Sequence, residues 1–218
     1  MSLAAQRVIW AIAILMALWY VGGTWYNRRR GIRTLTWLRE GLQRLGGRLE
    51  MVWIGSAASG AKAMVSKANP PFRHLEAIFL LESREILPLW AINRLRGRRD
   101  ELIIRAQLRS SRRGEIEVVP AGSRLERSLR REEQPPWEWE EGPHGLRIAR
   151  RGSQGKALSQ AVGAFLQDYG TSLYRLSWRR SRPHLLLHLR LSGLTERPAS
   201  DLFSALRTAL TYPRQGSL

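Results

Sequence analysis

The chain has 218 residues, 44% of them hydrophobic, which fits one ordinary domain or two small ones and excludes a wholly disordered protein. It contains no cysteine, which excludes disulfide frameworks, thiolate zinc sites and iron–sulfur sites. The formal net charge is +18, from 36 basic and 18 acidic residues, and this excess favours polyanionic neighbours such as nucleic acid or anionic lipid.

The first predicted element is a membrane-spanning helix. Nineteen consecutive residues without charge, from Val8 to Tyr26, would form a helix of about 28 Å, close to the ~30 Å hydrocarbon thickness of a bilayer. Trp10 and Trp25 lie near its two ends, where aromatic side chains favour the membrane interface. A cleaved signal peptide fits less well, because the run continues into arginines and not into small residues. We expect residues 1–27 to form a short tail and a single transmembrane helix.

The arginines that follow this run predict its orientation. They are Arg28, Arg29, Arg30 and Arg33, whereas only Arg7 precedes the run. Positively charged flanks remain on the cytoplasmic side of a membrane. We therefore expect a location in the plasma or inner membrane, with the N-terminus outside and the remaining chain in the cytoplasm. The same four arginines are candidate contacts to anionic lipid headgroups.

A second, basic helix is expected over residues 28–47, beside the membrane. Apolar residues recur there at three- and four-residue spacing and Gly46-Gly47 end the pattern. The apolar positions are Ile32, Leu35, Leu38, Leu42 and Leu45. A basic amphipathic helix next to a membrane span often lies in the interface. Alternatively its leucines pack onto the soluble domain, and the sequence leaves both arrangements open.

The remaining residues predict a cytoplasmic α+β domain of short strands and helices. No further run reaches the length of a membrane span. Strands are expected at 49–54 and 75–81, a helix is expected at 85–96, and residues 61–67 fit either a strand or a helix.

Two β-hairpins are predicted from alternating apolar and polar residues. The first joins a strand at 101–109 to one at 115–119, and the second joins 172–180 to 184–191. The second has apolar residues on one face of both strands and basic residues on the other. We expect both hairpins to be half-buried antiparallel pairs.

The basic face of the second hairpin is a candidate polyanion-binding surface. Its arginines are Arg175, Arg179 and Arg190. The alternation sends Tyr174 and Trp178 to the opposite, leucine-bearing face, whereas a single-strand nucleic-acid binder needs aromatic side chains among its arginines. A membrane-tethered nucleic-acid-binding module is therefore the alternative function.

The order of the elements resembles an internal duplication. Residues 101–122 and 172–193 each contain an expected hairpin, and each segment follows an expected strand and helix. This order predicts a tandem β-α-β-β-α pseudo-repeat, with α+β units at 48–131 and 137–218. A single mixed sheet without duplication is the alternative.

An acidic segment separates the two expected units. Residues 132–136 contain two prolines and predict a linker. In the strand that follows, Trp137 and Trp139 share one face, and Glu138 and Glu140 share the other. We expect this acidic strand to pair beside basic strands, since opposite charges across strands contribute ~0.2–1 kcal/mol. The same four residues are a candidate docking site for a basic partner protein.

The sequence contains no catalytic motif that we can identify. The loop at 55–63 matches a phosphate-binding loop only in part, because Lys62 is displaced by one residue. His184 and His188 would lie about 13 Å apart on a strand, at ~3.3 Å per residue, too far to share a metal ion. We expect no enzyme activity, no cofactor and no metal. The expected function is a membrane-anchored interaction or assembly module that binds another protein or the membrane surface.

Overall fold

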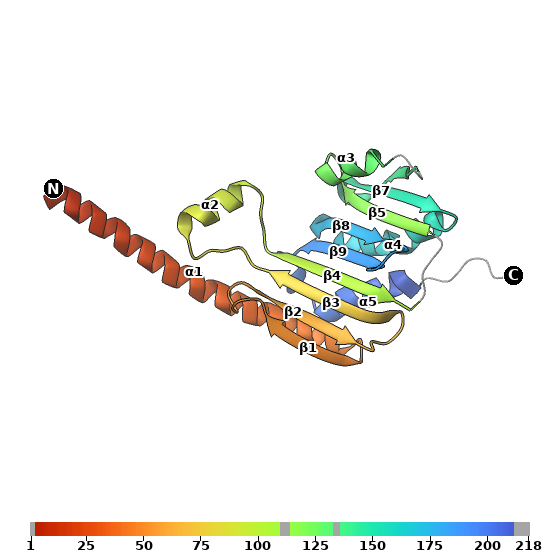
Figure 1. Ribbon diagram of the computed structural model, residues 1–218, viewed down its shortest axis with the longest axis horizontal. Coiled ribbons are helices and arrows are strands. Elements are labelled where there is room, and N and C mark those ends of the chain that lie inside the picture. Colours follow the sequence, from red (N-terminus) through yellow and green to blue (C-terminus); the bar gives the residue numbers. More distant parts are fainter. Residues whose placement is uncertain (1–2, 110–113, 133–135, 212–218) are drawn as a thin grey trace.

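A single long helix, α1 (Leu3–Gln43), has an apolar N-terminal segment and packs at its other end on an α+β domain (Figure 1). The computed structural model describes residues 3–109, 114–132 and 136–211. The N-terminal part of α1 extends away from the domain, and most of its side chains are exposed. Within the described ranges, α1 is the one helix whose length and composition would let it cross a membrane.

The two helices that we expected on either side of residue 27 form one continuous helix. The chain between Val8 and Gln43 contains no proline, so no residue there removes a helical hydrogen bond through a missing N–H. Gly46 and Gly47 follow the helix with φ values of 66° and 81°, and glycine adopts this left-handed conformation without strain. The expected end of the helix is confirmed, and the two segments expected as separate helices belong to one helix.

The leucines of the second half of α1 pack onto the domain. Leu38 and Leu42 are fully buried, and Leu45, in the turn after the helix, is 4% exposed. Gly41 permits the close approach of helix α5 (Ala199–Thr211), because a Cβ at this position would lie 2.6 Å from the Cβ of Ala199. Of the two arrangements that the sequence left open, the structure shows the packed one.

The described residues form one nine-stranded sheet in which every neighbouring pair is antiparallel. Its order is β1-β2-β3-β4-β9-β8-β5-β7-β6. The strands are β1 (Arg48–Trp53), β2 (Gly60–Ser66), β3 (Phe72–Leu80), β4 (Glu101–Leu108), β5 (Gly114–Pro120), β6 (Glu138–Glu141), β7 (Leu146–Gly152), β8 (Leu173–Trp178) and β9 (Leu185–Arg190). The segment that fitted either a strand or a helix is thus a strand.

The second predicted hairpin is confirmed, and the first is wrong. β8 and β9 pair with each other, but they lie between β4 and β5, which do not pair. Ile104 of β4 is opposite Leu187, and Val118 of β5 is opposite Leu176. Alternation within a strand indicates which face is buried, but it does not select the partner strand. The turn expected for the first hairpin falls partly on residues 110–113, outside the described residues.

The pairing also differs from a tandem repeat. β3 pairs directly with β4, whereas β7, the strand that precedes the helix and hairpin of the second expected unit, pairs with β5 and β6. Strands from the two expected units are therefore interleaved in one sheet. The expected linker at 132–136 lies mostly outside the described residues.

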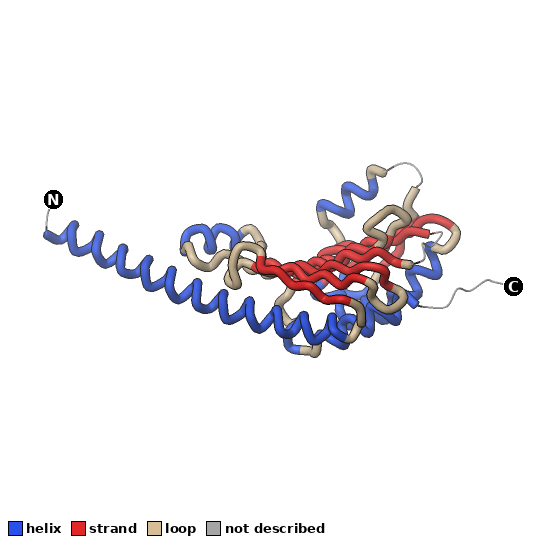
Figure 2. Tube along the Cα trace, turned by 60° about the horizontal axis from the view of Figure 1, so that its bottom comes forward, coloured by secondary structure: helices blue, strands red, loops and turns tan. Residues whose placement is uncertain are grey.

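Helices cover one face of the sheet, as Figure 2 shows. They are the C-terminal part of α1, α4 (Gly155–Tyr169) and α5 (Ala199–Thr211), and their buried side chains join those of the sheet in the main core. On the other face, α3 (Arg124–Arg130) lies over β5 and β7, where Val119, Leu129, Trp137 and Ala149 form a small second core. The remaining helix, α2 (Leu87–Leu95), lies outside both layers beside α1 (Figure 1).

Candidate functional site

The candidate site lies where α1 leaves the domain. The end of β3, helix α2 and the start of β4 meet α1 at this point (Figure 1). Two glycines of α1 permit the contact: a Cβ on Gly23 would collide with the carbonyl oxygen of Arg84, and one on Gly31 with the carbonyl oxygen of Ala57. We call this region the junction.

A buried carboxylate ties α1 to the sheet at the junction. Asp100, whose side chain is 3% exposed, accepts from Arg84 at 3.1 and 3.2 Å and pairs with Arg30 Nε of α1 at 2.7 Å. The backbone N–H of Glu82 also donates to Asp100 Oδ1, at 2.8 Å. Burial of a carboxylate is costly unless it is paired and hydrogen-bonded, and both conditions are met here.

A second buried carboxylate extends this network. Glu82 lies 3.0 Å from Arg84 and, more loosely, 3.6 Å from Arg94 and 3.7 Å from Arg99. Asn27 of α1 is fully buried, donates to the carbonyl oxygen of Glu82 at 2.7 Å and accepts from Arg84 at 2.9 Å. Asp100 and Asn27 therefore join the long helix directly to the domain, whereas the carboxylate of Glu82 acts on it only through Arg84.

Helix α2 packs against the apolar segment of α1. The rings of Trp19 and Trp90 lie 5.5 Å apart, and Trp19 Nε1 donates to the carbonyl oxygen of Arg84 at 2.8 Å. Pro88 lies in the first turn of α2. A proline is tolerated there because the N–H groups of the first turn have no intrahelical partner. α2 and the residue before it leave large apolar side chains exposed: Ile86, Leu89, Ile92 and Leu95, the last at 88%.

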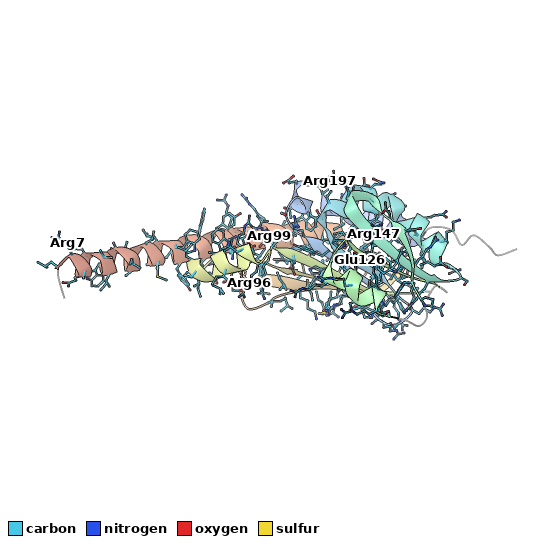
Figure 3. All side chains as sticks on the ribbon, turned by 90° about the horizontal axis from the view of Figure 1, so that it is seen from above. Arg7, Arg96, Arg99, Glu126, Arg147 and Arg197 are labelled. Atoms are coloured by element: carbon cyan, nitrogen blue, oxygen red, sulfur yellow. The ribbon has the colours of Figure 1, made fainter. Side chains whose placement is uncertain are left out.

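A pocket of about 930 Å³ opens between α1, α2 and the end of β9. Leu15, Leu18 and Trp19 of α1 form part of its apolar wall, together with Trp90 of α2. Its polar base contains both buried carboxylates, Glu82 and Asp100, and five arginines: Arg30, Arg84, Arg94, Arg99 and Arg190. Figure 3 shows Arg99 at this junction, far from Arg7 near the N-terminal end of α1.

The four arginines predicted to contact lipid do not share one environment. Arg28, Arg29 and Arg33 are exposed on α1, as a lipid-facing role requires, and Arg29 lies over the ring of Trp25 at 5.5 Å. Arg30 instead pairs with Asp100. Sequence reasoning missed its carboxylate partner because the two residues are far apart in the chain. The available signal was the charged pair Glu82 and Arg84, which interrupts an apolar stretch of the sequence and belongs to the same network.

Two of the three predicted polyanion-binding arginines neutralise a buried carboxylate. Glu117 is fully buried and pairs with Arg175 Nε at 3.0 Å and with Arg179 Nε at 2.6 Å, while Ser177 donates to it at 2.6 Å. Burial disfavours the charged form of Arg179, but the hydrogen bond and charge of Glu117 outweigh this and raise the pKa of Arg179 above its ordinary value. Arg190 lies apart from this pair, at the end of β9.

The prediction for Tyr174 is wrong, and the prediction for Trp178 is confirmed. The β8–β9 register shifts between Leu173 and Arg175, so that the alternation of faces is broken at Tyr174. Its ring lies 4.9 Å from that of His188 and 5.6 Å from the guanidinium of Arg190. Trp178 is 2% exposed in the main core.

The acidic strand pairs beside a basic one, as expected. Glu138 and Glu140 of β6 lie 3.2 and 3.4 Å from Arg150 of β7. Trp137 is 8% exposed, and Trp139 packs against the same small core. These contacts within the fold occupy most of the predicted docking site, and the side chain of Glu138 remains 75% exposed.

Other polar residues singled out in the sequence also have structural partners. Lys62 lies in β2 and pairs with Glu76 of β3 at 2.5 Å. His184 Nδ1 accepts from the backbone N–H of Leu108 at 3.0 Å, and His188 contacts a different group, Glu101, at 3.0 Å. In the described part of the chain, no group of residues is arranged to hold a metal ion.

No known protein family matches the chain, and no curated protein is similar to it in sequence. The described residues define a structural class instead: an α+β protein with an all-antiparallel nine-stranded sheet, carried on one long helix with an apolar N-terminal segment.

Proposed function

We propose that the protein is a single-pass membrane protein and a non-catalytic interaction or assembly module. Its N-terminus lies outside the cell membrane, α1 spans the bilayer, and the α+β domain lies in the cytoplasm against the membrane surface. The observation that carries this proposal is the apolar segment of α1, which is long enough to span a membrane and has none of its most apolar stretch buried in the domain.

Exposed apolar side chains near the same end of the domain support placement against a membrane. The end of β1 and the residue after it expose Val52, Trp53 and Ile54 by 59%, 37% and 38%. The turn that follows contacts α1 at Gly31. Together with the exposed side chains of α2, they form an apolar surface around the point where α1 leaves, which membrane lipid would cover.

The junction also supports an anchoring role. α1 enters the domain as one continuous helix, and the ion pair of Arg30 with Asp100 and the hydrogen bonds of Asn27 hold it there. Glu117 is held in the same manner by two arginines. Because each of these buried carboxylates is engaged in ion pairs within the fold, the geometry supports assembly better than acid–base catalysis.

Alkaline carbonate extraction of membranes tests the anchor, and a reporter fused to the C-terminus tests the orientation. We expect the protein to stay in the membrane pellet and the reporter to be cytoplasmic. Release by carbonate would contradict the anchor, and a reporter active outside the cell would contradict the orientation.

A membrane-tethered nucleic-acid-binding module is the second candidate. One observation favours it: Tyr174 lies beside Arg190, as stacking on bases requires. Purification from solubilised membranes, with and without nuclease, separates the two. A stoichiometric protein partner that resists nuclease supports assembly, whereas co-purified nucleic acid supports the alternative.

A further inference from the structure

The junction pocket combines an apolar wall with a cationic base. We propose that it binds one anionic phospholipid of the cytoplasmic leaflet, with an acyl chain along α1 and the phosphate among the arginines. This inference rests on the proposed function, because it requires α1 to span the membrane.

The length of the apolar wall matches one leaflet. The lining residues of α1 extend from Leu15 to Tyr26, which is about 16 Å of helix at ~1.5 Å per residue. Half of a hydrocarbon core is about 15 Å. Arg30 follows one helical turn later, so that the base of the pocket lies at the depth of the lipid headgroups.

The base carries excess positive charge. Its lining contains five arginines and two carboxylates, Glu82 and Asp100, and five minus two leaves a formal charge of +3. An anion bound there would balance charges that the protein itself does not balance. Guanidinium groups match the geometry of phosphate and can bind its oxygens in pairs.

Two of the arginines are available for a headgroup. Arg94 is 50% exposed and reaches Glu82 only at 3.6 Å. Arg190 has no carboxylate within ion-pair distance among the described residues and lies over Tyr174. By contrast, Arg30 and Arg84 are committed to Asp100.

A buried donor in the wall points to the same class of ligand. Trp90 Nε1 is buried and has no hydrogen-bond partner in the described part of the chain, whereas Trp19 Nε1 is satisfied by a carbonyl oxygen. A buried N–H without a partner is costly, and rotation of the indole ring when a lipid enters the pocket would let a phosphate or ester oxygen satisfy it. A free inorganic anion would leave the apolar wall uncovered, which favours a lipid as the source of the phosphate.

Two variants test the site by different means. Arg94→Gln with Arg190→Gln removes two charges from the base. Gly22→Leu fills the pocket without changing its charge, because Gly22 lines the pocket and a Cβ there meets nothing within 4 Å. The matched control is Arg96→Gln with Arg98→Gln, which removes the same charge from exposed arginines near the end of α2 that do not line the pocket.

The full-length protein is reconstituted in phosphatidylcholine nanodiscs with and without phosphatidylglycerol, and native mass spectrometry counts the lipids that it retains. We expect one retained phosphatidylglycerol for the wild type and the control, and occupancy lower by about tenfold or more in both test variants. Titration of the detergent-solubilised protein should show binding of short-chain phosphatidylglycerol, and millimolar inorganic phosphate should not displace it.

The following outcomes would overturn the inference. Equal retention by all variants would place the lipid elsewhere, and binding of inorganic phosphate as tight as that of the lipid would make this a site for a free anion. If carbonate extraction leaves the protein in the membrane but no phosphatidylglycerol is retained, only this inference fails. If carbonate releases the protein, the proposed function fails with it.

Discussion

Arg30 in α1 and Asp100 directly before β4 form an ion pair of 2.7 Å across 70 residues of chain. The carboxylate is almost fully buried and also binds Arg84. This contact sets the position of the long helix on the domain. It joins α1, at the point where the helix leaves the domain, to β4 in the middle of the sheet.

Asp100→Ala should therefore be strongly destabilising. It removes the carboxylate partner of Arg30, leaves Arg84 with Glu82 alone, and leaves the backbone N–H of Glu82 without its acceptor. Loss of one member of a buried pair costs about 3–5 kcal/mol. Urea unfolding of the detergent-solubilised protein measures the change. Glu138→Ala is the control, since its side chain is 75% exposed and its ion pair contributes at most about 1 kcal/mol. Equal losses in the two variants would contradict the structural role of Asp100.

Leu95→Cys should report that α2 lies in the membrane interface. The chain has no cysteine, so single-cysteine labelling needs no background substitutions. A spin label at Leu95, which is 88% exposed, should be accessible to a lipid-soluble relaxing agent in nanodiscs. Ser153→Cys, an exposed position in the turn between β7 and α4, should be accessible to a water-soluble agent. The same aqueous accessibility at both positions would show that α2 does not enter the bilayer.

Replacement of Arg175 and Arg179 by glutamine should destabilise the fold, because it leaves Glu117 buried without its charged partners. We expect a loss of about 3–5 kcal/mol, partly restored when Glu117→Gln is added to the same variant. Thermal unfolding measures both effects. Unchanged stability would contradict a stabilising role of the two arginines.

The effect of Arg190→Gln on nucleic-acid binding tests the alternative function more directly than Arg175 or Arg179. We expect the full-length protein to bind single-stranded RNA only weakly at physiological salt, with little change in this variant. Sub-micromolar binding, with a salt slope that falls by about 0.7 on loss of this one phosphate contact, would favour nucleic-acid recognition.

Glu126 should make stability depend on pH in the acid range. The hydrogen bond from Arg130, together with the backbone N–H of Gly122, holds the pKa of Glu126 below its ordinary value of 4.5. A carboxylate with a lower pKa in the folded state contributes stability above the unfolded-state pKa and loses it as the pH falls through the folded-state pKa. Wild-type melting temperature should thus fall more steeply below pH 4.5 than that of Glu126→Gln. Parallel profiles would show that Glu126 does not contribute.

Local patterns predicted the elements of this fold well. Alternation placed Leu185, Leu187 and Leu189 on the buried face of β9, and they are at most 1% exposed. The acidic strand pairs with a basic neighbour, as its charges indicated. Each of these properties depends on residues close together in the chain, whose side-chain directions follow from backbone geometry alone.

Contacts between segments far apart in the chain could not be predicted from the sequence. Tyr174 faces the basic side because of a bulge that depends on how β8 meets β9, and no residue type at that position marks it. β4 and β5 have the pattern of a hairpin, yet each pairs with a strand from late in the chain. The choice among compatible partner strands depends on total packing, which alternation does not encode.

By itself, the sequence determined that the chain has a long uncharged helix with arginines at one end, followed by an α+β domain, since composition and periodicity are local properties. Only the tertiary structure decided that the helix continues into the core, that Arg30 meets Asp100, and that Trp90 and Arg190 line one pocket. The physical reason is that these contacts join distant segments, and their geometry exists only after the sheet has brought the segments together.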